Sequence, residues 1–217
     1  MKNYARQQFS CKDAEAVSAA VASVEKATSG EVVPVVRSYS SRYRRPVLRW
    51  ILGCQMVFIC SWALGTAAIG EPLTPFGLLV FTGLYLLLTV FMFLLPEICP
   101  PFLRLLAGRR LTDEKVTEQA VNAFVRYGVS GTERRSGILI YVSLFERQVV
   151  ILADKGIDKK VAPETWKTVS EQIADGMRSG HPAEAMVRAI ESCRDLLAKY
   201  FPPTDKNPDE LPNFIME

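Results

Sequence analysis

The sequence contains a single histidine, five cysteines and none of the common catalytic motifs. It has no Walker loop, no Gly-x-Gly-x-x-Gly, no Gly-x-Ser-x-Gly and no His-Glu-x-x-His, which excludes the commoner nucleotide-binding, hydrolase and zinc-protease classes. The cysteines have neither zinc-site nor disulfide-framework spacing, which fits a reducing compartment. His181 has no accompanying nucleophile pattern, so triad chemistry is not expected.

Charge is missing from two long stretches in the middle of the chain, Trp50–Ile69 and Phe76–Leu95. Each is about as long as the ~20 apolar residues that an α-helix needs to cross a bilayer. Only the short turn 70–75 separates them, so we expect a transmembrane hairpin. A buried helical pair in a soluble protein is the alternative, but such helices usually carry a polar stripe, and Gln55 is the only strongly polar side chain of the first stretch.

The basic residues near the hairpin predict its orientation. Arginines crowd both outer ends of the hairpin, whereas the connecting turn has no Lys or Arg. The positive-inside rule therefore predicts two spans in the cell (inner) membrane, with both termini and the soluble domain in the cytoplasm. The net charge of +3 comes largely from these flanking arginines. We expect them to set the topology and to contact anionic lipid headgroups. No recognition motif for nucleic acid is present, so we expect the lipid bilayer and another membrane protein as partners.

Two crossings return the chain to the side it left, so the flanking segments can build one domain. We expect residues 1–48 and 97–203 to form this domain, 49–96 to form the hairpin and 204–217 to be a flexible tail, apart from a docking contact by Phe214 and Ile215. Together 1–48 and 97–217 are long enough for about one domain.

Helical and strand patterns alternate on either side of the hairpin. Apolar residues at helical spacing predict a helix over 13–27, followed by a strand at 31–36. A second helix is predicted over 112–127, with Thr112 as a partial N-cap and with Val116, Ala120, Ala123, Phe124 and Tyr127 on one face.

The remaining elements complete an α/β fold. Strands at 138–143 and 148–153 flank a tight reversal and predict an antiparallel hairpin, and two helices follow over 163–177 and 182–200. Because all three strands are almost continuously apolar, we expect both sheet faces to be buried under helices. The predicted fold is a small mixed β-sheet covered by α-helices, interrupted by the transmembrane hairpin.

Several stretches resemble one family. The segment 28–36, the longer segment Ser136–Ile157, and the match continuing through Trp166 and Ile173 to 197–202 are similar to the TPM domain. The hairpin would then be an insertion after the first strand. The resemblance implies the TPM α/β sandwich, an accessory role towards other membrane proteins, and a proposed acid phosphatase activity that depends on a divalent cation such as Ca²⁺ or Mg²⁺.

Candidate residues for such phosphatase chemistry lie just past the strand at 148–153. Asp154 and Asp158 flank Gly156, where a turn could bring two carboxylates around a hard cation, and Lys155 would neutralise phosphate charge. Glu31 is a candidate third carboxylate. The alternative for Asp154 is an ordinary turn residue that accepts local backbone bonds, with Gly156 providing a positive φ.

Two further groups of charged residues are expected to be exposed to solvent and to have no functional role. Glu146 and Arg147 are expected in a solvated turn, and residues 133–135 in a solvated polar loop. The sequence therefore predicts a membrane-anchored accessory or interaction module, or alternatively a metal-assisted phosphatase near the membrane surface.

Overall fold

The protein is described from a computed structural model covering residues 9–69, 74–132, 134–203 and 211–217. The chain divides into two compact units: residues 42–112 form the first, and 2–41 with 113–217 form the second. The first unit is inserted into the sequence of the second, as expected for a domain interrupted by a hairpin.

Two long apolar helices make up most of the first unit. Helices α3 (Arg44–Ile69) and α4 (Pro75–Ile98) are both long and apolar enough to cross a membrane, and none of their most apolar stretch is buried inside the protein. Thr74 caps α4 by accepting a 3.1 Å hydrogen bond from the Gly77 backbone. The Gln55 amide donates a 3.0 Å hydrogen bond to the Thr89 hydroxyl, so the polar side chain of the first span is paired within the hairpin.

Helix α5 (Pro100–Arg126) starts in the first unit and ends in the second. It is interrupted at Gly108, whose φ of 71° is left-handed. Thr112, expected as the N-cap, instead lies inside the helix and its hydroxyl donates to the Gly108 and Arg109 carbonyls.

The second unit is built on a four-stranded mixed sheet with the order β3-β2-β1-β4. Strands β1 (Glu31–Arg37) and β2 (Gly137–Ser143) pair in parallel through seven residues each, and β2 pairs antiparallel with β3 (Gln148–Ala153). The predicted hairpin of β2 and β3 is confirmed. The connection from β1 to β2 is a crossover that contains the whole first unit and the second half of α5.

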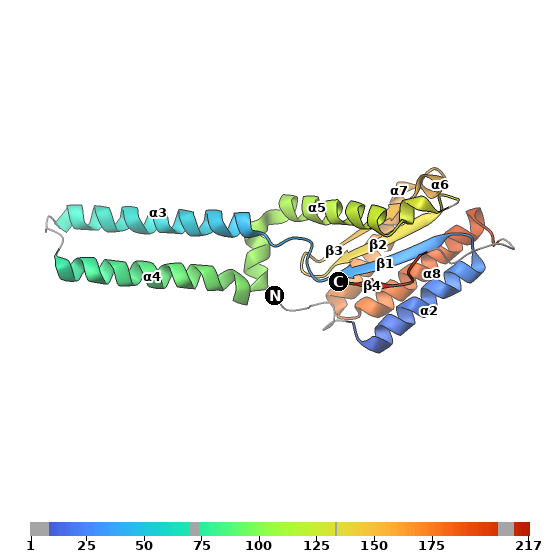
Figure 1. Cartoon of the computed structure of the whole chain (residues 1–217), viewed down its shortest axis with the longest axis horizontal. Coiled ribbons are helices and arrows are strands. Elements are labelled where there is room, and N and C mark those ends of the chain that lie inside the picture. The colour runs from blue at the N-terminus through green and yellow to red at the C-terminus, as the bar shows by residue number, and fades with distance from the viewer. Residues whose placement is uncertain (1–8, 70–73, 133, 204–210) are drawn as a thin grey trace. The chain divides into compact units, whose positions relative to one another are not determined.

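Helices cover both faces of this sheet (Figure 1). One core joins a sheet face to α2 (Cys11–Ala27), α7 (Pro163–Ser179) and α8 (Pro182–Tyr200). The other core joins the opposite face to the second half of α5 through the apolar positions predicted from its helical spacing. The predicted α/β sandwich is therefore confirmed, and the sequence pattern identified which side of α5 faces the sheet.

The ends of the sheet differ from the sequence-based expectation. Strand β3 lies at an edge and is only half-buried, because no further strand covers it. Strand β4 (Ile215–Met216) pairs in parallel with Val35 and Val36 at the other edge. Ile215 and Met216 thus belong to the sheet edge, and the Phe214 ring centre lies 6.1 Å from that of Phe9, in line with the docking contact expected of Phe214 and Ile215. Residues 204–210 lie outside the described residues.

Helices α7 and α8 approach each other closely at Gly176. A Cβ added to Gly176 would lie 2.0 Å from the Cβ of Ala185, so glycine is required for the two helices to approach this closely. Helix α7 ends at Gly180, which has a left-handed φ of 83°.

We expect Gly176→Ala to lower the free energy of unfolding of the second unit by about 1–3 kcal/mol, because the added methyl group overpacks the α7–α8 contact. The gain in helix propensity of about 1 kcal/mol offsets only part of this cost. Thermal denaturation followed by near-UV circular dichroism measures the change. Gly131→Ala is the control, because a Cβ there meets nothing within 4 Å. Equal melting temperatures for the two variants would contradict the packing argument.

Candidate functional site

Two buried carboxylates lie at the end of the sheet where β1 begins. Glu31 is 3% exposed and Asp154 is 4% exposed. The strand register places Glu31 opposite Gly137, and the Asp154 backbone N–H donates a 2.9 Å hydrogen bond to the Gly137 carbonyl on the other side. Side chains alternate along strands, so both carboxylates belong to the face covered by α5, with the side-chain-free Gly137 between them.

Asp154 caps a short helix and also lies near a positively charged side chain. Its Oδ1 accepts a 2.7 Å hydrogen bond from the Lys155 backbone, which caps the short helix α6 (Lys155–Asp158). Its buried Oδ2 has no hydrogen-bond partner among the described residues, and an Arg135 guanidinium nitrogen lies 3.9 Å away. Arg135 is therefore not simply a solvated loop residue. Glu133 of the same loop lies outside the described residues.

The other predicted phosphatase residues are distributed differently. Lys155 directly follows the buried Asp154, and Asp158 lies one helical turn further along. Both side chains are exposed on α6. Among the described residues no group of three His, Cys, Asp or Glu side chains could hold a metal ion. The structure thus places Glu31 and Asp154 on either side of Gly137 but does not gather Asp154, Asp158 and Glu31 into one ligand set. A divalent-cation site made of all three therefore does not fit this arrangement.

Gly156 has a different function from the one expected of it. It is not among the glycines with positive φ, and its requirement is spatial. A Cβ there would lie 2.5 Å from the Arg135 carbonyl, and the Gly156 N–H donates a 3.1 Å hydrogen bond to that same oxygen. The glycine thus lets the loop that carries Arg135 lie directly on α6.

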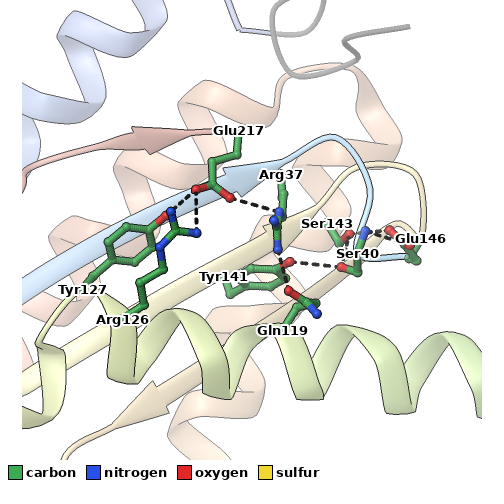
Figure 2. Close-up of polar contacts among 9 residues, drawn as sticks. All are labelled: Arg37, Ser40, Gln119, Arg126, Tyr127, Tyr141, Ser143, Glu146 and Glu217. Carbon is green, nitrogen blue, oxygen red and sulfur yellow. Dashed lines mark hydrogen bonds and ion pairs between the residues drawn. The ribbon is translucent and has the colours of Figure 1, made fainter. Parts of the chain in front are cut away.

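A second polar cluster lies at the opposite end of β1, under the second half of α5 (Figure 2). The Glu217 carboxylate is 3.1 Å from Arg37 Nε and 3.5 Å from an Arg126 guanidinium nitrogen, and it accepts a 2.6 Å hydrogen bond from the Tyr127 hydroxyl. Arg37 also donates a 2.6 Å hydrogen bond to the Gln119 side chain. We call Arg37, Arg126 and Tyr127 the edge site. Two guanidinium groups and a phenol around one carboxylate are a typical arrangement for binding an anion.

Beside the edge site, a buried network fixes the turn between β2 and β3. Glu146 is 7% exposed, and its carboxylate accepts a 3.0 Å hydrogen bond from the Ser40 backbone and another from the Ser143 hydroxyl. The Ser40 hydroxyl lies 2.7 Å from that of Ser143 and 3.1 Å from that of Tyr141. The expectation of a solvated Glu146 is therefore wrong. Such donors stabilise a buried carboxylate. The hydrogen bonds of Glu146 also connect the chain after β1 to the end of β2.

Both tyrosines of this region have raised pKa values. For Tyr141, burial raises the pKa above the ordinary 10.0, while the hydrogen bond with Ser40 and the charge of Arg37 oppose the shift. For Tyr127, burial and then the hydrogen bond to Glu217 raise the pKa, and the charges of Arg126 and Arg37 act in the opposite direction. Both phenols therefore stay protonated to a higher pH than a free tyrosine does.

One indication of the edge site is present in the sequence. Arg37 directly follows the predicted strand 31–36, and Ser143 is the polar last residue of the predicted strand 138–143. The carboxyl ends of parallel strands meet at one end of a sheet, where ligand sites commonly lie. Glu217 and Gln119, in contrast, are polar residues distant in sequence whose approach no local pattern predicts.

The stability of the second unit should fall above about pH 10, because the folded state holds the Tyr141 proton more tightly than the unfolded state does. This stabilisation is fully present below the ordinary tyrosine pKa and is lost as the pH rises through the raised one. We expect Tyr141→Phe to be about 1 kcal/mol less stable at pH 8, because the hydrogen bond with Ser40 is lost, and to show a smaller decline between pH 9.5 and 11. Ser40→Ala keeps the phenol and removes a contact that lowers its pKa, so it should show at least the full decline in thermal denaturation. Identical pH profiles for wild type and Tyr141→Phe would contradict this assignment.

Comparison with known proteins agrees with the fold. The sequence profile of the TPM domain matches residues 103–196, which include nearly all of α5, the β2–β3 hairpin, α6, α7 and most of α8. The NMR structure of the BA42 protein from the psychrophilic bacterium Bizionia argentinensis is similar, with a TM-score of 0.57 at 20% identity over 96% of this chain and 95% of that one. Among curated protein sequences, none matches the chain.

The matched range includes Ser136–Ile157, Trp166 and Ile173, whose sequence resembles the TPM domain. Helix α2 and strand β1 lie outside the matched range, yet β1 pairs with β2 along its whole length. The structural likeness at this identity concerns the fold alone. The segment from α5 to α8 is thus similar to the TPM domain, and two long apolar helices lie between the first strand and this matched region.

Proposed function

We propose that this protein is anchored in the cell (inner) membrane by α3 and α4 and that its TPM domain is an accessory module for assembly or quality control of other membrane proteins. The observation that carries the proposal is that no residue in the most apolar stretch of either helix is buried inside the protein. Leu64, Phe76 and Leu79 are each at least 70% exposed. Apolar surface on this scale is unfavourable in water and is typical of lipid contact.

The distribution of charge supports a cytoplasmic domain. The first unit has arginines only at the open end of the hairpin, namely Arg42, Arg44, Arg45, Arg49, Arg104, Arg109 and Arg110. Basic residues are retained on the cytoplasmic side and bind anionic headgroups there. Two crossings then leave the TPM domain and both termini on that side.

Cysteine labelling tests this topology. We expect a membrane-impermeant maleimide to label Thr74→Cys, at the start of α4, in intact cells, and to label the exposed Cys11 on α2 only after the cells are permeabilised. Cys193 should stay unlabelled in both cases, because it is buried and burial raises its thiol pKa to about 12. Thr74→Ser is the matched control. Labelling of Cys11 in intact cells would place the domain on the exported side and contradict the proposal.

The accessory function predicts a stable complex. We expect the full chain, extracted in a mild detergent, to elute with another membrane protein in a fixed ratio during size-exclusion chromatography. Recovery of a lone monomer under conditions that preserve other membrane complexes would argue against this function.

A metal-assisted phosphatase is a second candidate, supported by the buried Asp154. Its Oδ2 has no hydrogen-bond partner among the described residues, it shares a sheet face with Glu31, and Arg135 and Lys155 bring positive charge to the same end of the sheet. In this candidate Asp154 and Asp158 act on the phosphate ester and Lys155 neutralises its charge. Arg135 competes with a cation for Asp154, and this weakens the candidate relative to the accessory module.

For the phosphatase candidate we expect phosphomonoester hydrolysis by the purified chain to depend on Mg²⁺, Ca²⁺ or Mn²⁺ and to fall at least about 100-fold in an Asp154→Asn, Asp158→Asn double variant. Asparagine still caps a helix, so α6 should form in the variant. Asp175→Asn, at an exposed position on α7, is the matched control. If the wild-type rate does not exceed that of the double variant, the phosphatase candidate is excluded and the accessory module stands alone.

A further inference from the structure

Within the part of the chain that the structure describes, a short segment covers the outer edge of β1. Ile215 and Met216 pair with Val35 and Val36, the Glu217 backbone N–H donates to the Val36 carbonyl, and the Ser38 N–H donates to the Glu217 carbonyl, both at 2.9 Å. An exposed sheet edge of this kind is a common site for adding an extended peptide as a further strand. A segment with so few backbone bonds is replaceable by another of the same pattern.

Pro34 limits where such a strand can bind. Alternate residues of β1 face the same edge, and Val36 faces β4, so the nitrogen of Pro34 faces that edge too. Proline has no N–H to donate, which prevents pairing from continuing towards the start of β1. An added strand is therefore confined to the end of β1 that carries Arg37.

The edge site adds side-chain selectivity to this backbone recognition. Residues alternate along β4, and Glu217 faces α5, where Arg37, Arg126 and Tyr127 converge on its carboxylate (Figure 2). The Arg37 and Glu217 side chains remain 29% and 30% exposed. Ion pairs with this exposure are individually weak, so the carboxylate is exchangeable.

Contacts other than those with Glu217 hold Arg37 and Arg126 in place. Arg37 is held by Gln119 at 2.6 Å, and the Arg126 guanidinium carbon lies 5.6 Å from the centre of the Tyr127 ring. Beneath them is a cavity of about 50 Å³, whose lining includes Asn122 and Tyr141. The two arginines therefore remain positioned for an acidic group when Glu217 moves away.

We propose that the β1 edge together with the edge site binds an extended segment of another protein, in which two apolar residues precede an acidic one, and that residues 215–217 occupy this site in the same chain. The bound segment forms a parallel strand beside Val35 and Val36 and places its carboxylate against Arg37, Arg126 and Tyr127. The inference rests on the proposed accessory function and specifies the chemistry of the partner. Residues 215–217 then act as an internal competitor of that partner.

Peptide binding to the full chain in nanodiscs tests the proposal. The probes are fluorescein-labelled LPNFIME, which repeats residues 211–217, and LPNFIMQ, both amidated so that no terminal carboxylate replaces the side chain. We expect Glu217→Gln protein to bind LPNFIME at least tenfold more tightly than wild type does, and at least tenfold more tightly than it binds LPNFIMQ. Adding Arg37→Gln should abolish the preference for the acidic peptide.

The other outcomes overturn the proposal. Absence of binding to folded Glu217→Gln protein, verified by its melting temperature, or equal binding of both peptides would exclude acidic strand recognition. Displacement of LPNFIME by equimolar inorganic phosphate would assign the arginines to a free anion. Dimerisation of wild type that is lost in Glu217→Gln would assign the site to a second copy of this chain. A membrane partner that still co-purifies after a negative peptide result would leave the accessory function intact and reject only this site.

Discussion

The parallel pairing of β1 with β2 is the constraint on which the rest of this structure depends. Parallel neighbours require a crossover that brings the chain back along the sheet, and here the second half of α5 covers the sheet face that the crossover spans. Residues 42–112 are inserted into that same crossover. The closure entropy grows only logarithmically, so a threefold longer connection costs about 1 kcal/mol. The domain therefore accommodates the inserted unit at a small entropic cost.

Strand β1 also joins the two polar clusters of the domain. Glu31 at its start and Arg37 at its end are both odd-numbered positions, so both belong to the face covered by α5. About 20 Å of apolar strand separates them, at about 3.3 Å per residue. One end of this face carries Asp154 near Arg135, and the other carries arginines around a carboxylate. The charges are thus partly compensated at each end, and the apolar middle of the strand forms the core.

Local sequence patterns predicted most of this fold. Helical spacing located α2, α7 and α8 to within two residues at either end, and nearly continuous apolar runs located β2 and β3. Helical spacing also identified the side of α5 that packs on the sheet, because burial along a helix follows the 3.6-residue period. These features depend on residues that are neighbours in sequence, and a single chain records them directly.

The features that the sequence did not reveal depend on distant residues. Strand β4 has only two residues, too few for a periodic pattern, and its pairing with β1 links positions about 180 residues apart. Glu146 follows an apolar strand as an exposed turn residue would, but donors from Ser40 and Ser143 make its burial favourable. The neighbours of Asp154 could likewise not be predicted, since Arg135 reaches it only through the loop that Gly156 accommodates.

The order in which the chain is synthesised has a consequence for β1. Its partner strand β2 emerges about 100 residues later, after both apolar helices have been made. At a translation rate of 5–20 residues per second, β1 waits about 5–20 s without its main neighbour. During that time its run of valines is an aggregation-prone segment, and Pro34 interrupts it at the centre. The proline that limits pairing at the finished sheet edge thus also protects the nascent strand while the hairpin is being made.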